Sequence, residues 1–536
     1  MLATVILYYE LYIPGAVATN IITSFGMTFN QFIWVSVIGN LVGAFASLVA
    51  GLADRWGRAN LVVGGLIVTG LLTALALPNA KSATTYTVWF AILSLVEGMI
   101  LVATPALIRD FSPQVGRGTA MGFWTLGPVL GSLVVTSVSS ATLPSHPDWR
   151  FQFYLCGIIG LVVAVLAFFT LRELSPRLRD QLMVSMRDKV LIEARAKNID
   201  LEAASKNHWR QMLTPSVVGP AFAISIFLLF YYIAVGFFVV YFATLFGMTP
   251  AEANKLANFY WIFNAVSLVV TGFLTDKLGV RKPFMVFGTL VSLIGTAIWA
   301  TRATHPETSH TTFAILMVVI SVGGGIAYTA WMTAFTETVE ERNPAATATG
   351  LAVWGWTIRI VVTLSLIVFG LVLPATKVLV EQGAQVGEIA TQYSKQLAIA
   401  GALSDQTKKD LTANPADPAA GKAAVEELIK AKVAKTPDEA VADLKFLGEN
   451  PIPPKDVEYL TKHGPEVQKA AADSPGQWQT WWWVTFAGQL LFLPFIFLLR
   501  GRWSPKKARQ DAEAHERLVA EEMARLDGRT PATDAV

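Results

Sequence analysis

A series of long, continuous apolar runs constrains this chain more than any other feature of its sequence. A helix needs about 20 apolar residues to cross the hydrocarbon core of a bilayer. A transmembrane β-barrel would alternate apolar and polar residues along each strand, and these runs do not alternate. The sequence therefore predicts an all-α polytopic membrane protein with twelve spans, at about 3–24, 31–53, 60–79, 85–108, 118–141, 151–172, 217–245, 252–275, 283–302, 311–335, 346–373 and 478–500.

The composition excludes several other classes of protein. Hydrophobic residues make up 53% of the 536 residues and charged residues 15%, whereas soluble chains carry roughly a quarter charged residues. These values argue against a soluble enzyme and against a disordered protein. The net charge of +3 argues against a nucleic acid as partner. We expect no catalytic residues and no cofactor.

The sequence also lacks the residues that a metal or nucleotide site would need. Its one cysteine, Cys156, and its six histidines form no ligand-spaced cluster, so no metal is expected. A Gly-x4-Gly-Lys-Ser/Thr segment does not occur in the sequence. We therefore expect no nucleotide as partner and no ATP-driven activity.

Basic residues predict the orientation of the spans. Of 42 lysines and arginines, 25 lie on the side of the two termini, while the short loops of the opposite face hold four, Lys81, Arg150, Lys255 and Arg302. By the positive-inside rule both termini lie in the cytoplasm, and the expected location is the plasma (inner) membrane. The first run is not a signal peptide, because it lacks a basic n-region and Glu10 interrupts it. Since it begins at residue 3, a start upstream of Met1 stays open.

Two halves of the chain repeat one another. Phe25-Gly-Met-Thr28 precedes the second span, and Phe246-Gly-Met-Thr249 precedes the eighth, 221 residues later. Repeated halves are typical of secondary transporters with a site between two bundles. The predicted organisation is a six-helix bundle (1–172), a cytoplasmic linker (173–212), helices 7–11 of a second bundle (213–373), an extracytoplasmic helical insertion (374–477), helix 12 (478–500) and a cytoplasmic tail (501–536).

A second repeated segment carries a family resemblance. The loop after the second span reads Gly51-Leu-Ala-Asp54-Arg55-Trp-Gly57-Arg58, and the loop after the eighth reads Gly272-Phe-Leu-Thr-Asp276-Lys277-Leu-Gly279-Val-Arg281. With these loops the sequence resembles the major facilitator superfamily, although Ala50 stands where the family has its first glycine. The resemblance covers the twelve spans and leaves out 374–477 and the tail. It implies two pseudo-symmetric six-helix bundles and transport by alternating access.

The resemblance further implies that the two loops form a cytoplasmic latch, which holds the outward-facing state. A carboxylate beside a helix N-terminus is favourable by about 0.3–1 kcal/mol, so Asp54 is expected at the start of the eleventh span. Arg58 is expected to pair with Asp110 at the end of the fourth span. A plain positive-inside loop is the alternative. The second copy is expected to place Asp276 at the start of the fifth span and to pair Arg281 with Glu337.

The fifth span looks like the Gly-Pro motif of proton-driven exporters in this superfamily. Its small residues Gly127 and Gly131 allow close helix packing, and Pro128 bends the helix. Ordinary close packing is the alternative. A third exporter element is absent from the fourth span, where Ser94 and Glu97 replace the arginine and glutamine of the family pattern. This departure weakens the expectation of the usual exporter proton relay.

Three charged residues lie inside the predicted spans, away from the loops. Glu10 is in the first span, Glu97 is central in the fourth, and Arg359 is central in the eleventh. A charge at mid-bilayer costs at least about 2.5–3.5 kcal/mol, so such residues face a wet cavity or a partner. Glu10 and Glu97 are candidates for proton coupling, and a buried structural role is the alternative for each.

Arg359 is a candidate for substrate binding. A guanidinium stays charged and binds carboxylates through two hydrogen bonds, so it can hold an anionic substrate or form a salt bridge. Trp356 shares its helix face, three residues earlier. Each further candidate is an aromatic or amide side chain whose alternative role is packing: Tyr232, Tyr260, Asn264 and Tyr328.

These features predict a secondary active transporter that moves a small organic solute. A proton is the expected coupling partner, because carboxylates lie within the spans and nucleotide motifs are absent. The Gly-Pro motif favours proton-coupled export. Arg359 favours the alternative, uptake or exchange of an organic anion such as a carboxylate. A transporter-like sensor, with an unknown partner bound by the insertion, stays open as a third class.

Overall fold

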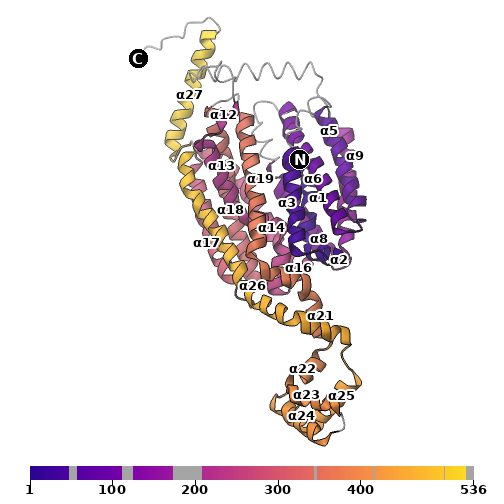
Figure 1. Cartoon of the computed structure of the whole chain (residues 1–536). Helices are drawn as coiled ribbons and strands as arrows, with labels where there is room; N and C mark the ends of the chain where they lie inside the picture. Colours follow the sequence, from indigo (N-terminus) through magenta and orange to yellow (C-terminus); the bar gives the residue numbers. More distant parts are fainter. Residues whose placement is uncertain are drawn as a thin grey trace. The chain divides into compact units, whose positions relative to one another are not determined.

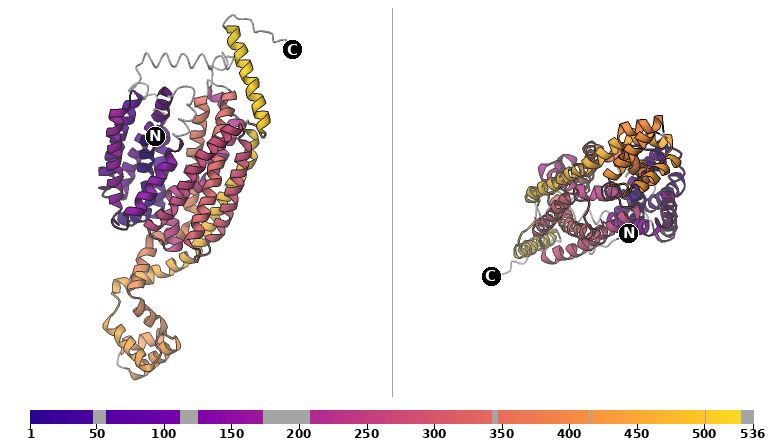
Figure 2. Two further views of the ribbon diagram at one scale, coloured as in Figure 1. Left: turned by 180° about the vertical axis from the view of Figure 1, so that it is seen from behind. Right: turned by 90° about the horizontal axis from the view of Figure 1, so that it is seen from below.

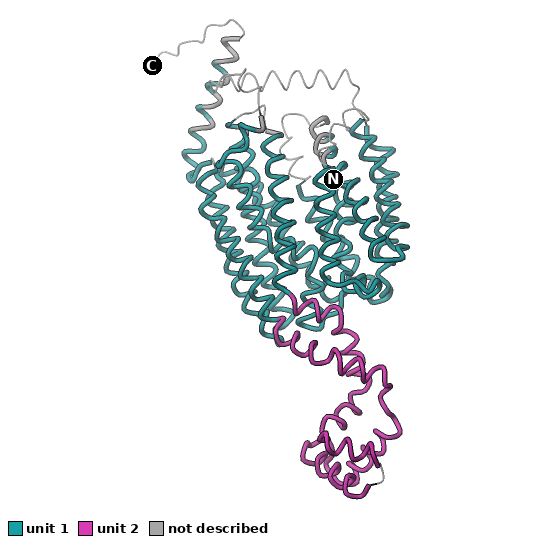
Figure 3. The backbone as a smooth tube through the Cα atoms, in the orientation of Figure 1, with its two compact units in different colours: residues 1–373, 475–536 teal, residues 374–474 magenta. Residues whose placement is uncertain are grey.

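The computed structural model describes residues 1–46, 57–111, 125–172, 208–342, 347–414, 417–499 and 501–526. These residues form helices joined by turns and short connections, and no strand occurs among them. The chain divides into two compact units (Figure 3). Unit 1 is Met1–Leu373 with Pro475–Val536, and unit 2 is Pro374–Ser474.

The first half of unit 1 contains helices that pack mainly on one another, α1 on α8 and α9, α3 on α6, and α5 on α6 and α9. They form one group of side-by-side helices (Figure 1). Pro128 lies in the first turn of α8, where the missing N–H of proline costs nothing. The bounds are α1 Leu2–Ala16, α2 Ala18–Phe25, α3 Phe29–Ala46, α5 Arg58–Leu71 with a π-helical turn Leu72–Ala76, α6 Ala83–Phe111, α8 Gly127–Thr142 and α9 Trp149–Thr170.

The second half of unit 1 forms the other group (Figure 2). Its helix α18 packs on α16 and α17, and α13 packs on α19. The bounds are α12 His208–Met212, α13 Pro215–Phe227, α14 Leu229–Gly236, α15 Phe238–Phe246, α16 Pro250–Leu278, α17 Lys282–Arg302, α18 His310–Arg342, α19 Thr347–Val372, α26 Pro454–Phe495 followed by a 3-10 turn Ile496–Leu498, and α27 Pro505–Leu526.

Nine helices of the described chain are long and apolar enough to cross a membrane. The number rises to eleven if two bent pairs each count as one span, α1 with α2 (62°) and α13 with α14 (44°). The span expected at 118–141 appears as the shorter apolar helix α8, because residues 112–124 lie outside the description. The chain is thus a multi-pass membrane protein, and the twelve-span count stays a prediction.

The repeated Phe-Gly-Met-Thr segments fold in the same way. Gly26 and Gly247 end a helix in the left-handed conformation, at φ 58° and 64°, which glycine adopts without steric cost. Each threonine then caps the next helix. Thr28 and Gln31 exchange hydrogen bonds of 2.8 and 3.1 Å, and the equivalent pair, Thr249 and Glu252, forms the same capping box. The sequence repeat is therefore also a structural repeat.

Unit 2 is a small helical body. Its core contains Ile399, Leu403, Ala424, Leu428 and Ala440. Ser404 caps one helix and donates its backbone N–H to Glu427 Oε2 at 2.8 Å, which ties two helices together. The bounds are α20 Pro374–Val378 with a π-helical turn Leu379–Gly383, α21 Ala384–Gln392, α22 Ser394–Ala402, α23 Asp405–Ala413, α24 Pro418–Lys430 and α25 Pro437–Glu449, followed by the start of α26.

Three tryptophans at the entrance of the last predicted span pack inside unit 1. A tryptophan run at this place suggests an interfacial aromatic belt, but Trp478, Trp481 and Trp482 are buried. Their rings contact Tyr241, Phe369 and Trp299. Only Trp483 among the four neighbouring tryptophans is exposed. The expectation of a belt is therefore wrong for three of them, because neighbouring helices cover this part of α26.

Candidate functional site

The first copy of the predicted latch lies mostly outside the described residues. Asp54 belongs to the segment 47–56, and the side chain of Asp110 is also outside the description. Arg58 is described as the first residue of α5 and is buried. Gly57 before it has φ 89°, so this loop contains a backbone position that favours glycine.

The second copy forms a compact ion-pair cluster. Arg281 Nη2 lies 3.2 Å from Glu337 Oε1 at the end of α18, the pairing that was expected. The same nitrogen lies 2.9 Å from Asp276 Oδ1. Asp276 therefore pairs with the arginine of its own loop, and the start of the fifth span, where it was expected, lies outside the description. Gly279, at φ 65°, ends α16 and makes this reversal possible.

The glycines of the Gly-Pro segment pack against α1. A Cβ atom on Gly127 would clash with Thr4, and one on Gly131 would lie 3.0 Å from the Val5 carbonyl oxygen and collide with Tyr8. Helix α8 can approach α1 this closely only because both positions lack a side chain. The segment thus fixes α1, the helix that carries Glu10.

Glu10 points into the first-half bundle. Its side chain is buried, and a Cβ atom on Gly160 of α9 would clash with Oε1, so the missing side chain of Gly160 makes room for the carboxylate. Neither carboxylate oxygen has a hydrogen-bond partner among the described residues. The nearby Thr69 hydroxyl donates instead to the Leu66 carbonyl at 3.3 Å. Glu10 therefore faces away from the second half.

Glu97 of α6 is the second buried carboxylate of this bundle. It is 1% exposed, and neither oxygen has a hydrogen-bond partner in the described part of the chain. Glu10 and Cys156 lie within electrostatic range of it. An uncompensated buried charge costs several kcal/mol, and this cost vanishes when the carboxylate binds a proton. The two glutamates are therefore chemically suited to carrying one.

Arg359 reaches from α19 of the second half to α3 of the first. Its Nη1 atom donates to the Asn40 carbonyl at 3.4 Å, which is long for a hydrogen bond. No ion pair joins Arg359 to an acidic side chain within the described ranges. The ring of its helix neighbour Trp356 packs against the ring of Phe45, with the ring centroids 6.5 Å apart. The guanidinium thus keeps most of its donors available to a ligand.

Two tyrosines of α1 lie near this guanidinium, and tyrosines of the second half lie near one of them. Tyr8 and Tyr12 of α1 lie within electrostatic range of Arg359, and Tyr8 is also in range of Tyr328 and Tyr232. The hydroxyls of Tyr231 and Tyr232 have no hydrogen-bond partner among the described residues. A buried hydroxyl without a partner costs about 1–3 kcal/mol, so a polar ligand would stabilise this cluster.

Two of the predicted substrate-binding residues make packing contacts within the second half. Tyr260 stacks on Phe230 with ring centroids 5.7 Å apart. The Asn264 amide donates to the Ser321 carbonyl of α18 at 2.9 Å. The binding roles of Tyr260 and Asn264 stay predictions, as do those of Arg359, Tyr232 and Tyr328.

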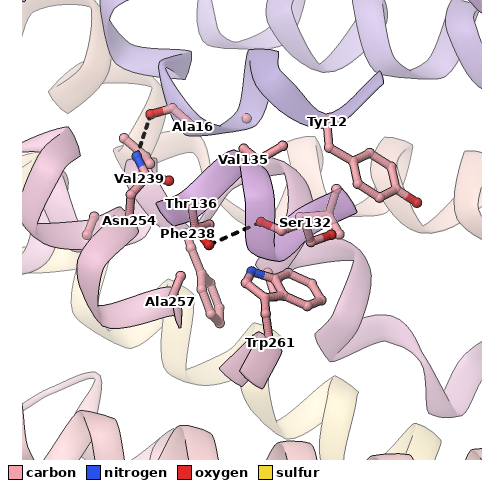
Figure 4. A pocket seen from close by; sticks show the side chains of 14 residues that line it. Tyr12, Ala16, Ser132, Val135, Thr136, Phe238, Val239, Asn254, Ala257 and Trp261 are labelled. Atoms are coloured by element: carbon pink, nitrogen blue, oxygen red, sulfur yellow. Dashed lines mark hydrogen bonds between the residues drawn. The ribbon is translucent and has the colours of Figure 1, made fainter. Parts of the chain in front are cut away.

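Contacts between α8 and α16 close the two halves against each other, and the sequence reasoning missed them. Asn258 accepts from Thr136 at 2.6 Å and from Ser137 at 3.1 Å, and Asn254 donates to the Ala16 carbonyl at 2.8 Å. Figure 4 shows the cavity beside them, which has a volume of about 10 Å³. This volume holds about one water molecule, so no solute fits there in this conformation. The sequence signal that could have predicted these contacts is the run of small polar residues in the fifth span.

A helical multi-pass membrane protein with repeated halves and a polar cluster between them has the general form of a transporter. The family model of the Major Facilitator Superfamily matches residues 1–358, so the chain belongs to this superfamily. The proteins of this family and its structural neighbours are membrane transporters and not enzymes.

Individual relatives are distant. The cis,cis-muconate transport protein of Acinetobacter baylyi is 27% identical over 263 residues, which are 49% of this chain and 58% of that protein. A bicyclomycin resistance protein homolog of Haemophilus influenzae is 28% identical over 150 residues, which are 28% of this chain and 33% of that protein. The chain thus matches less than two thirds of the length of each relative.

A solved structure shows the fold over a larger part of the chain. The crystal structure of a bacterial homolog to the human lysosomal transporter Spinster, in an inward-facing and unoccupied conformation, has a TM-score of 0.54 to this chain. The superposition covers 94% of this chain and 97% of that one, at 15% sequence identity. The likeness at this identity is one of fold.

Proposed function

We propose that this transporter moves a small organic anion, such as a carboxylate, together with a proton. The observation that carries the proposal is a separation of unpaired charges between the two halves. Arg359 reaches the interface of the halves without an acidic partner in the described chain, while Glu10 and Glu97 lie in the first half without hydrogen-bond partners. Arg359 binds the anion in this proposal, and the two glutamates carry the proton.

The chemistry of each group fits its proposed role. A guanidinium at mid-membrane costs at least about 2.5–3.5 kcal/mol, and an anionic substrate removes part of that cost by pairing with it. The muconate transport protein of A. baylyi, by its name a carrier of a dicarboxylate, supports this class of substrate. The proposal keeps the twelve-span arrangement in the plasma membrane, with both termini and the latch loops in the cytoplasm and the segment 374–477 outside.

Export of a drug-like compound is the second candidate function. It is favoured by the resemblance of the segment around Gly127, Pro128 and Gly131 to the Gly-Pro motif of exporters, with which the close packing of both glycines against α1 is compatible. The bicyclomycin resistance protein homolog of H. influenzae supports the same direction. A neutral or cationic exported compound would not need Arg359, so the charge of the transported solute separates the two candidates.

The test is transport by the purified chain in proteoliposomes. With cis,cis-muconate, benzoate and a neutral antibiotic as probes, we expect accumulation of a carboxylate driven by a pH gradient. Glu97→Gln and Glu10→Gln should each lose this accumulation but keep exchange of labelled for unlabelled solute. Arg359→Lys should weaken transport of the carboxylate by about tenfold or more, since a lysine cannot form the paired hydrogen bonds.

Lys81→Gln is the matched control, because it removes an exposed charge from the loop that precedes α6. Wild-type accumulation by both glutamate variants would show that neither carries the proton. Equal losses for anionic and neutral probes in Arg359→Lys would assign the arginine a structural role. Transport of the neutral probe alone would favour the second candidate.

A further inference from the structure

The end of α26 and the start of α27 lie against the turn between α16 and α17. The 3-10 turn Ile496–Leu498 packs on α17, and a Cβ atom on Gly279 would lie 3.2 Å from the Cβ atom of Ala508 in α27. The predicted orientation puts this turn at the cytoplasmic surface of the membrane. The segment 496–510 has five basic residues and no acidic one, and the segment 276–282 has three basic residues and one acidic one. Positive charge therefore gathers at this end of the second half.

Lys282, the first residue of α17, is the buried member of this group. It is 8% exposed, and its Nζ atom lies over the ring of Trp503, 5.9 Å from the ring centroid. No acidic side chain of the described chain pairs with Lys282, and Asp276 and Glu337 pair with Arg281 instead. Buried charges in proteins are paired as a rule. The Nζ atom is not one of the fully enclosed polar atoms of the described residues, so an anion can reach it from the surface.

Exposed apolar side chains lie beside this cation. Phe497 is 68% exposed and Trp503 46%, and their ring centroids are 5.8 Å apart. Phe497 and its exposed neighbour Leu498 end the last helix that is long and apolar enough to cross the membrane. Tryptophan is enriched at the level of the lipid headgroups. The patch thus combines a cation and an aromatic ring at headgroup level with an apolar surface for an acyl chain.

We propose that Lys282, Arg502 and Trp503 form a binding site for the headgroup of an anionic phospholipid in the cytoplasmic leaflet. The Lys282 ammonium donates to a phosphate oxygen, and Arg502, exposed and next to Trp503 in the chain, donates to another. The exposed lysines in the first turn of α27 add attraction for an anionic surface. A free phosphate has the same charge but no acyl chain to cover the apolar side chains, so the patch fits a lipid. The site does not depend on which solute the transporter moves.

The test measures the lipid that the purified full-length protein binds. The protein is stripped of lipid in detergent and titrated with phosphatidylglycerol or with phosphatidylcholine of the same acyl chains, and native mass spectrometry counts the bound lipids. We expect wild type to bind phosphatidylglycerol about tenfold more tightly, because basic side chains at the membrane surface attract anionic headgroups. Lys282→Gln should weaken this binding by about tenfold, the loss typical of one hydrogen bond to a charged group. Lys282→Arg should retain most of it.

Two further variants keep the test specific. Lys255→Gln is the matched control, because it removes an exposed lysine near the other end of α16, a helix of 29 residues that is therefore about 44 Å long. It should bind phosphatidylglycerol like wild type. Trp503→Ala changes an exposed side chain outside the helices and leaves every charge in place. It should weaken the binding by about threefold, because it removes the ring that positions the ammonium.

Each of the other outcomes overturns the site. Wild-type affinity for phosphatidylglycerol in both Lys282→Gln and Trp503→Ala would show that these side chains do not bind the headgroup. Equal losses in Lys282→Gln and Lys255→Gln would make the effect one of net charge. Equal affinities of wild type for the two lipids would refute recognition of the anionic headgroup. Displacement of phosphatidylglycerol by an equal concentration of inorganic phosphate would show a site for the free anion in place of a lipid site.

Discussion

Removing the amide of Asn258 should weaken the closure between α8 and α16. Its Oδ1 accepts from Thr136 at 2.6 Å and from the exposed Ser137 at 3.1 Å. A hydrogen bond contributes about 0.5–1.5 kcal/mol to stability. The bond from Ser137 contributes less than the bond from Thr136, because Ser137 is exposed. Asn258→Ala should therefore destabilise the conformation in which α8 and α16 are in contact by about 1–2 kcal/mol. That free energy shifts a two-state population by about 5–30-fold. The shift favours the state in which these helix ends separate.

Spin labels on the two helix ends measure this shift. Ser145→Cys follows α8 and Lys255→Cys lies on α16, both at exposed positions, in a chain whose buried Cys156 has been replaced by serine. Pulsed electron-spin measurements should show a long-distance population that grows in Asn258→Ala. Thr296→Val is the matched control, because its hydrogen bond to Gln489 (3.2 Å) lies within the second half. Distance distributions that do not differ from wild type would refute the assignment of Asn258 to the closure.

Two further predictions concern other parts of the chain. Gly160→Ala should displace the Glu10 carboxylate and reduce pH-driven accumulation of solute severalfold. Gly64→Ala is the control, because there is open space around its Cβ position, and it should leave accumulation unchanged. Equal accumulation in the two variants would show that Glu10 tolerates displacement. In unit 2, hydrogen bonds from the backbone N–H and the hydroxyl of Ser404 hold the pKa of Glu427 below its usual range. A lowered pKa stabilises the fold above the ordinary value, and this effect is lost as the pH falls through the lowered value. Glu427→Gln should therefore reduce the hydrogen-exchange protection of α23 and α24 at about pH 7, and the difference from wild type should disappear once the pH is below the lowered pKa of Glu427. A difference that persists in acid would contradict the role of this carboxylate charge.

Local signals made part of the fold readable from the sequence. Thr28 with Gln31 and Thr249 with Glu252 are capping pairs at fixed spacing, and the glycines before them mark helix ends. The ion pair between Arg281 and Glu337 was also predicted from the sequence, because the pattern of the repeated loop indicates an acidic partner for its arginine at the end of a neighbouring span. The bend between α1 and α2 follows Pro14 and Gly15, a local signal that the prediction of one unbroken span overlooked. The close approach of Gly15 to the Val235 carbonyl of the other half could not be predicted, because it joins residues far apart in the chain.

The arrangement of the candidate site was harder to predict from the sequence than the helix ends were. Glu10, Glu97 and Arg359 stand out because charge is rare in a span, so each was found singly. Their arrangement depends on contacts between residues far apart in the chain, such as Arg359 with Asn40 or Asn258 with Thr136. Tyr8 carried no signal of its own, because a tyrosine in an apolar run is ordinary until its neighbours in space are known.

Glu97 also has a consequence for the biosynthesis of the chain. A helix enters the membrane more readily the more apolar it is, and α6 is less apolar than α5 and α9, its partners in the bundle. A glutamate at its middle raises the barrier to insertion further. Helix α5 precedes α6 and packs along it, so the two can enter as a hairpin in which the apolar member assists the polar one. Glu97, one of the two residues proposed to carry the proton, therefore raises the cost of inserting its own helix, and entry together with α5 would offset part of this cost.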